Sequence, residues 1–385
     1  MIYYSNERVT CDNMKKVLIL YATYGNGHKA VADYIKKYLD DTNNYECLNI
    51  DLISYTIPLF GNISKKSSGF IMEKFPFLWS LLFFSFDNKV SAYISGKMSS
   101  TIFKNKKLQK VIKDFNPDIT IATHFYGTDI ISHYNKKNIT NSKIVTIVTD
   151  YYTHNFWLSH SKDIDAIVVG NVEERFYLLK KGFKRNKIFT SGIPISPNLG
   201  DNLDKDRIKS KLKINNDKKT VLFFCGGSNG NMSNLIYFKE ILKNNYDCNV
   251  LFIAGKNKSA YRKAKEYVKR YNRKNIKIYG FVNNINEFYI ASDFVVSKPG
   301  GAQVTECLFF NKPMLLVKSN GGQELFNRNY LCRNGYAKKA RTKWSFNMNF
   351  EYMLTDYCLN KMSKRKSKID YKSSMDKLYK IINKL

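Results

Sequence analysis

The sequence predicts an α/β protein built from two Rossmann-like domains that face each other across a cleft. Two observations support this fold class. Short β-branched and aromatic runs alternate with segments of helical period along the whole chain, a pattern typical of βα units and parallel sheets. A stretch with two prolines at residues 192–197 separates two series of such units, so each series can build its own sheet.

The expected strands are the short apolar runs that end at Gly, Asn or Asp residues. In the first half they cover residues 16–22, 46–50, 119–123, 143–149, 166–170 and 188–190. In the second half they cover residues 220–225, 250–254, 276–279, 294–297 and 314–318.

The proline stretch divides the chain into an N-terminal domain, residues 1–194, and a C-terminal domain, residues 198–355. Residues 356–385 are basic, and we expect them to form a helix that packs back on the N-terminal domain.

Length and composition indicate a globular protein without a membrane-spanning helix. The 385 residues are enough for two to three domains of about 150 residues. Mean hydropathy is −0.39, and no apolar run approaches the roughly 20 residues that a spanning helix needs. The mixed polar start predicts no secretory signal, and seven scattered Cys without a CxxC pair predict reduced thiols and no zinc site. We therefore expect a cytoplasmic protein.

The net charge of +31 suits a polyanionic partner, either a nucleic acid or an anionic membrane. Basic residues gather at 256–277 and 338–385, where the alternative is an ordinary solvated helix face. Because no nucleic-acid-binding motif accompanies the charge, we expect a membrane surface and no nucleic acid.

The aromatic segment 75–86 departs from the βα pattern. It carries six aromatic side chains between basic flanks and is too short to span a bilayer. Aromatic rings and lysines together are typical of a helix that lies in the membrane interface, although an ordinary core helix is the alternative. The expected membrane contacts are Phe77, Trp79, Phe83 and Phe84.

A glycine loop follows the first expected strand. Gly25, Gly27 and Ala30 satisfy the dinucleotide-binding pattern G-x-G-x-x-G/A, so a nicotinamide- or flavin-dependent dehydrogenase must be considered. His28 stands inside this loop, however, where an imidazole is better suited to act as a general base facing the cleft. We therefore take His28 as the candidate catalytic residue, with cleft neighbours Gly25, Asn26 and Gly27.

Three further loops in the second half are suited to a phosphorylated, hydroxyl-rich ligand. The first two open helices with glycines, and backbone amides there can hold a diphosphate. Glu306 follows in the first turns of its helix, where a carboxylate can accept from both hydroxyls of a ribose. The third loop adds amide and carboxylate groups for sugar hydroxyls. The candidate ligands are Gly226, Gly227, Ser228, Ser297, Gly300, Gly301, Thr305, Glu306, Gln323 and Glu324.

These loops resemble a known family. Residues 297–301 with 305–306, followed by 322–324 and Asn327, look like the donor site of the GT-B glycosyltransferases related to the enzyme that adds N-acetylglucosamine to lipid I. Residues 23–28, 123–125, 148–157 and 190–195 resemble, more narrowly, the diacylglycerol glycosyltransferases, which include bacterial processive glucosyltransferases and plant galactolipid synthases.

The resemblance implies an inverting hexosyltransferase that needs no metal or cofactor. It takes a UDP-hexose, expected to be UDP-glucose, in the C-terminal domain and diacylglycerol in the N-terminal domain. Glu306 would then bind the ribose, Phe281 would flank the uracil, and Gln323 and Glu324 would hold the hexose. The glycine-loop residues with Thr305 would hold the diphosphate.

The resemblance assigns the proton acceptor to His28. Three other cleft residues, His124, Asp150 and His154, could instead be the base or its orienting partner. An acceptor whose tails lie in lipid also requires docking on the inner face of the cell membrane, which agrees with the aromatic and basic features.

Several alternatives stay open at this point. Residues 318–320 and 302–303 depart from the family pattern and bear on the donor sugar, which could be galactose or N-acetylglucosamine. The acceptor could be another lipid or a lipid-linked sugar, and transfer could be processive. An NAD-dependent oxidoreductase and a non-enzymatic membrane binder are the competing classes.

Overall fold

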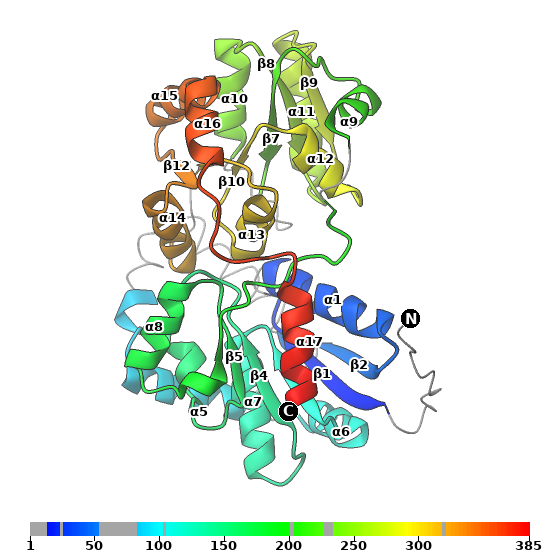
Figure 1. Cartoon of the computed structure of the whole chain (residues 1–385), viewed down its shortest axis with the longest axis vertical. Helices are drawn as coiled ribbons and strands as arrows, with labels where there is room; N and C mark the ends of the chain where they lie inside the picture. Colours follow the sequence, from blue (N-terminus) through cyan, green and yellow to red (C-terminus); the bar gives the residue numbers. More distant parts are fainter. Residues whose placement is uncertain are drawn as a thin grey trace, which may run out of the picture.

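The computed structural model describes residues 14–23, 26–53, 83–102, 105–200, 204–226, 234–317 and 321–385. They form two α/β domains, the N-terminal one below the C-terminal one in Figure 1. Each domain contains a six-stranded sheet whose neighbouring strands all pair in parallel. The predicted fold class is confirmed. No helix in these ranges is long and apolar enough to cross a bilayer.

The N-terminal sheet has the strand order β2-β1-β3-β4-β5-β6. Its strands are β1 (Lys15–Tyr21), β2 (Tyr45–Asp51), β3 (Ile119–Ala122), β4 (Lys143–Ile147), β5 (Ala166–Val168) and β6 (Ile188–Phe189). Its helices are α1 (Asn26–Asp41), α5 (Lys89–Ile102), α6 (Lys106–Phe115), α7 (Phe125–Lys136), η2 (Asn155–Leu158), α8 (Val172–Lys180) and η3 (Arg185–Lys187). Val17 to Leu20 are fully buried, as expected of a parallel strand that is covered on both faces.

The C-terminal sheet has the strand order β12-β11-β10-β7-β8-β9. Its strands are β7 (Lys219–Phe224), β8 (Cys248–Ile253), β9 (Ile276–Tyr279), β10 (Phe294–Ser297), β11 (Met314–Leu316) and β12 (Ala337–Lys339). Its helices are α9 (Lys205–Lys211), α10 (Leu235–Asn244), α11 (Lys258–Arg270), α12 (Ile285–Ala291), α13 (Gly301–Phe309), α14 (Gln323–Arg333), α15 (Lys343–Met353) and α16 (Asp356–Ser363).

All eleven expected strands are present, with ends that differ by up to two residues. The sequence prediction omitted β12, which lies at the edge of the sheet. It has only three residues, two of them lysines, so it shows neither an apolar run nor a useful alternation.

The last helix, α17 (Ser374–Lys384), returns to the N-terminal domain and lies beside α1 (Figure 1, red). Tyr38 donates a hydrogen bond to Asp376, and Asn44 donates to the Tyr379 hydroxyl at 2.9 Å. The apolar face of α17 includes Leu378, Ile381 and Ile382. It belongs to a hydrophobic cluster that residues of both domains form. The chain therefore crosses between the domains twice.

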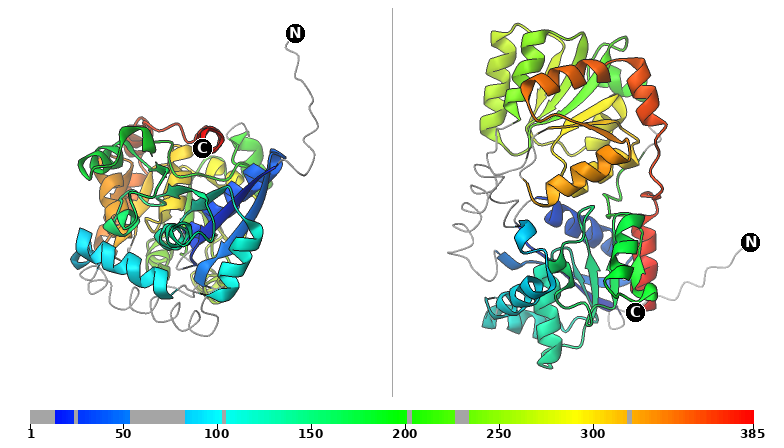
Figure 2. Two further views of the ribbon diagram at one scale, coloured as in Figure 1. Left: turned by 90° about the horizontal axis from the view of Figure 1, so that it is seen from below. Right: turned by 90° about the vertical axis from the view of Figure 1, so that its left-hand side faces the viewer.

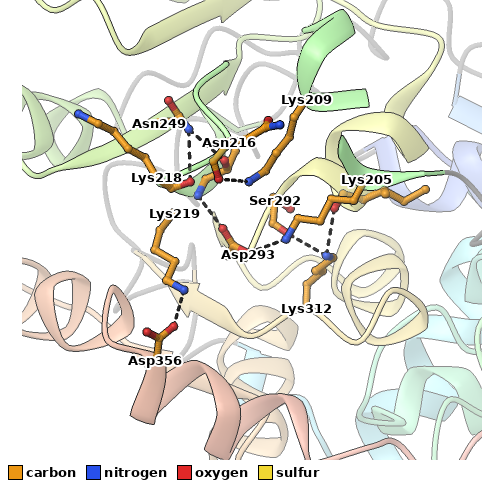
Figure 3. A network of polar contacts seen from close by, with 12 residues as sticks. Lys205, Lys209, Asn216, Lys218, Lys219, Asn249, Ser292, Asp293, Lys312 and Asp356 are labelled. Atoms are coloured by element: carbon orange, nitrogen blue, oxygen red, sulfur yellow. Dashed lines mark hydrogen bonds and ion pairs between the residues drawn. The ribbon is translucent and has the colours of Figure 1, made fainter. Parts of the chain in front are cut away.

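A partly buried polar network lies at the amino ends of the C-terminal strands (Figure 3). Asp293, just before β10, accepts from the backbone N–H of Thr220 at 2.7 Å and from Lys205 Nζ at 2.8 Å. Lys312 Nζ donates to the Ser292 carbonyl at 2.7 Å, and burial lowers the pKa of this lysine to about 8. Because ligands of such folds bind at the opposite, carboxyl ends of the strands, we interpret this network as structural.

One glycine fixes the place where the two crossings meet. Gly192 has φ 87°, and a Cβ there would lie 2.7 Å from Tyr371 and 2.8 Å from Ile369. Both the backbone conformation and the close approach of residues 369–371 therefore require glycine at this position.

Three glycine-to-alanine substitutions should separate the destabilisation due to the positive φ from that due to the close contact. Gly182 has φ 92° but nothing within 4 Å, so Gly182→Ala should lower the free energy of unfolding by about 1 kcal/mol. Gly192→Ala adds the clash and should cost about 3 kcal/mol. Gly200, with no neighbour within 4 Å and no positive φ, is the matched control and should change stability by less than about 0.5 kcal/mol. Urea denaturation measures all three, and equal losses at 182 and 192 would contradict the close-contact argument.

Candidate active site

The site lies where the strand order reverses in each sheet. In the N-terminal domain, His28 lies in the first turn of α1 after β1, rather than in the preceding loop, and His124 is the N-cap of α7 after β3, so the two lie on either side of the reversal. In the C-terminal domain, the loops after β7 and β10 carry Gly226 and residues 297–301. Such reversal points open a crevice at the carboxyl ends of parallel strands. The two predicted glycine-loop regions therefore occupy equivalent places in the two domains.

These two crevices face each other closely. A Cβ on Gly301 would lie 1.9 Å from the Thr149 carbonyl oxygen, so the start of α13 rests directly on the backbone after β4. A Cβ on Gly27 would lie 4.0 Å from Ala302 Cβ, and α1 packs against α13. The loops of both domains therefore contribute to a single site.

The hydrogen bonds of His28 fix its tautomer. Nδ1 lies 2.7 Å from the Thr123 carbonyl oxygen and 2.9 Å from Thr149 Oγ1. Because a carbonyl oxygen can only accept, Nδ1 must carry the hydrogen, and Nε2 of the neutral ring keeps its lone pair. Nε2 makes no hydrogen bond within the described part of the chain. His28 can therefore accept a proton from a ligand.

Charges around His28 tune its basicity. Burial lowers the pKa of His28, while the Asp150 carboxylate and the Thr123 carbonyl oppose this by favouring the protonated ring. Burial raises the pKa of Asp150, opposed by His28 and by a hydrogen bond from Asn327. The charge of Asp150 therefore favours the protonated form of His28, and that of His28 favours ionised Asp150.

The other two predicted histidines are held as helix caps. His124 Nδ1 accepts from the Tyr126 N–H at 3.3 Å, and its ring meets the His28 ring edge to face at 4.8 Å. Burial, then His28, lowers the pKa of His124. In His154, Nδ1 accepts from the Phe156 N–H at 3.2 Å and Nε2 donates to the Phe83 carbonyl at 2.9 Å. Both nitrogens of His154 are thus occupied, whereas His28 keeps an open one.

Asn327 joins the two domains at the site. It is fully buried in α14, and its Nδ2 donates to Asp150 Oδ1 at 2.7 Å and to the Pro299 carbonyl at 3.0 Å. Its Oδ1 accepts from the backbone N–H of Tyr151 at 2.7 Å. The sequence motif places Asn327 in the expected donor site, but its carboxamide bonds to protein groups of both domains.

The start of α13 is built for an anion. Gly300 is its N-cap and contributes no side chain, and the first backbone N–H groups of a helix have no partner within the helix. Thr305 is fully buried and its hydroxyl bonds to the Gly301 carbonyl at 2.7 Å and to the Tyr151 hydroxyl at 2.9 Å. Ser297 is likewise buried and donates to the Lys298 carbonyl at 3.1 Å. Both hydroxyls thus stabilise the loop through hydrogen bonds to its own backbone carbonyls.

Glu306 is buried between two tyrosines. Its Oε1 accepts from Tyr34 of α1 at 3.1 Å and its Oε2 accepts from Tyr289 at 2.9 Å. Burial raises the pKa of Glu306 to about 7, although both hydrogen bonds lower it. Each carboxylate oxygen has a second lone pair, so hydroxyl groups of a ligand can still bind there.

Two glycines set the start of α14. Gly321 has φ 82° and Gly322 has φ 55°, values that favour glycine. The helix then presents half-buried Gln323 and Glu324 in its first turn, and Lys298 Nζ donates to Glu324 Oε1 at 3.2 Å. The predicted sugar-binding residues therefore lie beside the predicted diphosphate loop.

The remaining predicted residues are partly outside the described ranges. Phe281 is 62% exposed, with Lys256 Nζ 5.2 Å from its ring centre, which leaves a ring face for a base to stack on. Phe83 is half-buried and Phe84 is 43% exposed. Asn26 begins α1, and Gly226 has φ 117°. Outside the described residues lie Gly25, Gly227, Ser228, Phe77 and Trp79.

Sequence reasoning did not single out several residues that the site uses. Thr149 holds His28, Tyr34 and Tyr289 hold Glu306, and Lys298 pairs with Glu324. Thr149 and Lys298 stand inside the quoted motifs and could have been found there. The two tyrosines carry no such signal, because their contacts join distant parts of the chain. Among the described residues, no group of three or more His, Cys, Asp or Glu side chains is placed to hold a metal ion.

Known proteins match both domains. The family model "Monogalactosyldiacylglycerol (MGDG) synthase" matches residues 28–195, and "Glycosyltransferase family 28 C-terminal domain" matches residues 220–380. Proteins named processive diacylglycerol β-glucosyltransferase are similar over most of their length. The one from Staphylococcus saprophyticus is 26% identical, with 85% of this chain and 82% of the relative covered. The one from Bacillus licheniformis is 27% identical, with 84% and 82% covered.

Solved structures support the same architecture. MurG of Acinetobacter baumannii has a TM-score of 0.62 at 13% identity, with 96% of this chain and 100% of that chain covered. MnaA of Staphylococcus aureus in complex with UDP has a TM-score of 0.60 at 17% identity, with 96% of both chains covered. At these identities the likeness concerns the fold alone. With both family domains in their expected order on this fold, the chain belongs to the GT-B diacylglycerol glycosyltransferase family.

Proposed function

We propose that this glycosyltransferase moves a hexose from a UDP-sugar to the free hydroxyl of 1,2-diacylglycerol, with inversion at the sugar carbon. The observation that carries the proposal is an open imidazole nitrogen, His28 Nε2, on the N-terminal crevice against which the start of α13 packs. The names of the relatives, diacylglycerol β-glucosyltransferases, support diacylglycerol as the acceptor and glucose as the sugar.

His28 acts as the general base in this reaction. Its Nε2 takes the proton of the acceptor hydroxyl as that oxygen attacks the sugar carbon from the face opposite the diphosphate. Thr123 and Thr149 hold the ring in the tautomer that leaves Nε2 unprotonated. Asp150 stabilises the imidazolium that forms.

The C-terminal domain binds the donor in this proposal. The glycine-loop amides and the N-terminus of α13 hold the diphosphate and offset the charge that grows on it as the bond breaks, so no metal ion or cofactor is required. Glu306 accepts from the ribose, Phe281 stacks on the uracil, and Gln323 and Glu324 bind the hexose. Ser297 and Thr305 shape the diphosphate loop through their internal hydrogen bonds.

Galactose is the second candidate sugar, because the model that matches the N-terminal domain is named for a galactolipid synthase. The relatives' names also include the word processive, which supports repeated transfer to the glycolipid product. The same open Nε2 can serve a sugar hydroxyl of that product.

Helix α5 supports docking on a membrane. Val90, Tyr93 and Ile94 lie three and four residues apart and are 69%, 65% and 51% exposed, so they share one outward face. The opposite face carries Ala92 and Gly96, both buried, and a Cβ on Gly96 would lie 2.8 Å from Ser159 Cβ. A helix whose outer face contacts water normally carries polar side chains on that face and apolar side chains on the buried one. Figure 2 shows α5 on the outside of the N-terminal domain.

We therefore propose a peripheral protein on the inner face of the cell membrane, with anionic lipid and not nucleic acid as the partner of its positive charge. Phe84 and Phe86, which precede α5 in the chain, are also exposed. Each lysine near an anionic surface contributes on the order of 1 kcal/mol, which salt reduces.

The test is transfer of labelled sugar from UDP-glucose, UDP-galactose and UDP-N-acetylglucosamine to diacylglycerol in anionic and neutral vesicles, with thin-layer separation of the products. We expect a monoglycosyl and then a diglycosyl lipid from UDP-glucose, with more product on anionic vesicles. Absence of glycolipid with every donor, together with no UDP binding in calorimetry, would overturn the proposal.

Substitution of His28 should separate chemistry from binding. His28→Gln should lower kcat at least ~100-fold, because a general base contributes about 10²–10⁴-fold, while the Kd for UDP stays within twofold. Because burial lowers the pKa of His28, the wild-type rate should reach its plateau at a lower pH than an exposed histidine would give. His133→Gln, a histidine on α7 outside the site, is the control. A wild-type pH profile in the glutamine variant would exclude His28 as the base.

Substitution of Glu306 should weaken the ligand and stabilise the free protein. A carboxylate whose pKa is raised by folding, here to about 7, makes the protein less stable as pH rises from about 4.5 to 7. Glu306→Gln removes that effect and should raise the free energy of unfolding at pH 8 by about 1–3 kcal/mol. UDP affinity should fall about 10–100-fold, since hydrogen bonds to a charged acceptor contribute roughly 1.5–3 kcal/mol. Calorimetry and urea denaturation measure both, and unchanged UDP affinity would exclude the ribose contact.

Charges on the outer face of α5 should prevent docking. The double variant Val90→Asp/Ile94→Asp should reduce sedimentation with anionic vesicles and activity on them at least ~10-fold, because both side chains would carry charge into the interface. UDP affinity should not change. Trp344→Asp, a 73% exposed aromatic on α15, is the matched control and should bind vesicles normally. Equal losses in the two variants would show that α5 is not the docking face.

A further inference from the structure

The strongest unassigned feature is the contact between Asn327 and Asp150 across the domain boundary. Asn327 has no exposed surface, and its three polar contacts are with Asp150 Oδ1, the Pro299 carbonyl and the Tyr151 N–H, at 2.7, 3.0 and 2.7 Å. Its amide hydrogens and its carbonyl oxygen are therefore all used by protein groups.

These contacts join the donor loop to the partner of the base. Pro299 lies in the diphosphate loop of the C-terminal domain, whereas Asp150 and Tyr151 follow β4 of the N-terminal domain. Thr149, the preceding residue, bonds to His28 through its hydroxyl and touches Gly301 through its carbonyl. The contacts of Asn327 with Asp150 and Tyr151 are thus joined, through the backbone of residues 149–151, to the Thr149 hydroxyl that bonds to the imidazole.

Within the described ranges, Asn327 is the group that donates a hydrogen bond to the Asp150 side chain, and an ionised carboxylate in this half-buried place requires such a donor. The titratable groups that face the pair are His124, beside His28, and Glu324, whose charge also acts on Asp150. Glu324 disfavours ionisation of Asp150, so the hydrogen bond from Asn327 is the interaction from the C-terminal domain that favours it.

We propose that Asn327 is a positioning residue for the transfer reaction: it keeps the Asp150 carboxylate ionised and directed at His28. Because Asn327 belongs to the donor-binding domain, the base has its charged partner only while the two domains are closed. This inference rests on the proposed function of His28, but it concerns a contact that can be measured without turnover.

The experiment combines a double-mutant cycle with a direct titration. Asp150→Asn keeps the hydrogen bond, since the new amide oxygen accepts from Asn327, but removes the charge. Asn327→Leu removes the hydrogen bond and leaves a side chain of similar size. If Asn327 acts through Asp150, each single variant should lower kcat about 100-fold and the double variant should be no worse than either. Independent contributions would instead multiply to about 10⁴-fold.

Titration of labelled histidines by NMR gives the second readout. The chain has five histidines, and His28→Gln identifies the resonance of interest. Asp150→Asn and Asn327→Leu should lower the pKa of His28 by the same amount, and the acidic limb of the kcat profile should move with it. Asn334→Asp is the control, because Asn334 also lies at α14 but bonds only to the Tyr330 carbonyl of its own helix, at 2.9 Å. It should shift neither quantity.

The outcomes distinguish this inference from its alternatives. If the kcat losses of the two single variants multiply in the double variant, the inference is wrong. It is also wrong if the pKa of His28 responds to Asp150→Asn but not to Asn327→Leu. A sugar-binding role for Asn327 would raise KM for the UDP-sugar without moving the pH profile, and would also overturn it. If Asn327→Leu does not fold, Asn327→Ser replaces it. A wild-type protein that makes no glycolipid would overturn the proposed acceptor, whereas the titration would still decide the role of Asn327.

Discussion

The contact between the start of α13 and the backbone after β4 is the constraint on which the rest of the site depends. Gly301 lies so close to the Thr149 carbonyl that no side chain fits between them. This approach brings a positive helix end, suited to a diphosphate, into the same crevice as the imidazole of His28. It also allows α1 and α13 to pack together, so that Tyr34 of one domain reaches Glu306 of the other. A larger residue at 301 would separate the start of α13 from the backbone beside His28.

Closure has an electrostatic consequence, because it buries titratable groups of both signs beside one another. Burial raises the pKa of Asp150 and of Glu306 and lowers the pKa of His28 and His124. Each shift moves the group towards its neutral form, and hydrogen bonds from Asn327, Tyr34 and Tyr289 oppose it for the carboxylates. Groups in this balance respond strongly to an arriving anion or proton. The same packing that joins the two domains therefore limits the charge of the groups between them.

The strands, the glycine turns and the place of His28 beside one of them could be predicted from the sequence, because each is a local pattern: a β-branched run, a glycine that opens a helix, a histidine next to a glycine turn. Partners across the domain boundary could not be predicted in this way. Tyr34 and Glu306 are 272 residues apart, and Asp150 and Asn327 are 177 apart. Asn327 shows the limit well, since its place in a sugar-binding motif is visible in the sequence but the three protein groups that occupy its carboxamide are not. The edge strand β12 was missed for the different reason that two of its three residues are lysines.

The segment after β4 also connects the reacting groups to the outer surface of the N-terminal domain. Tyr152 stacks on Phe326 of α14 at 3.7 Å, and Phe84 meets the same ring at 5.3 Å. A few residues further on, Asn155 donates to Asp87 at 2.6 Å, and η2 supports the buried face of α5. The residues that position Asp150 are therefore continuous with those that position the exposed apolar face of α5. Residues 149–158 thus connect the domain contact at Asn327 with the short helix η2 that packs against the buried face of α5. The proposed docking helix and the contact between the domains therefore depend on one segment of backbone.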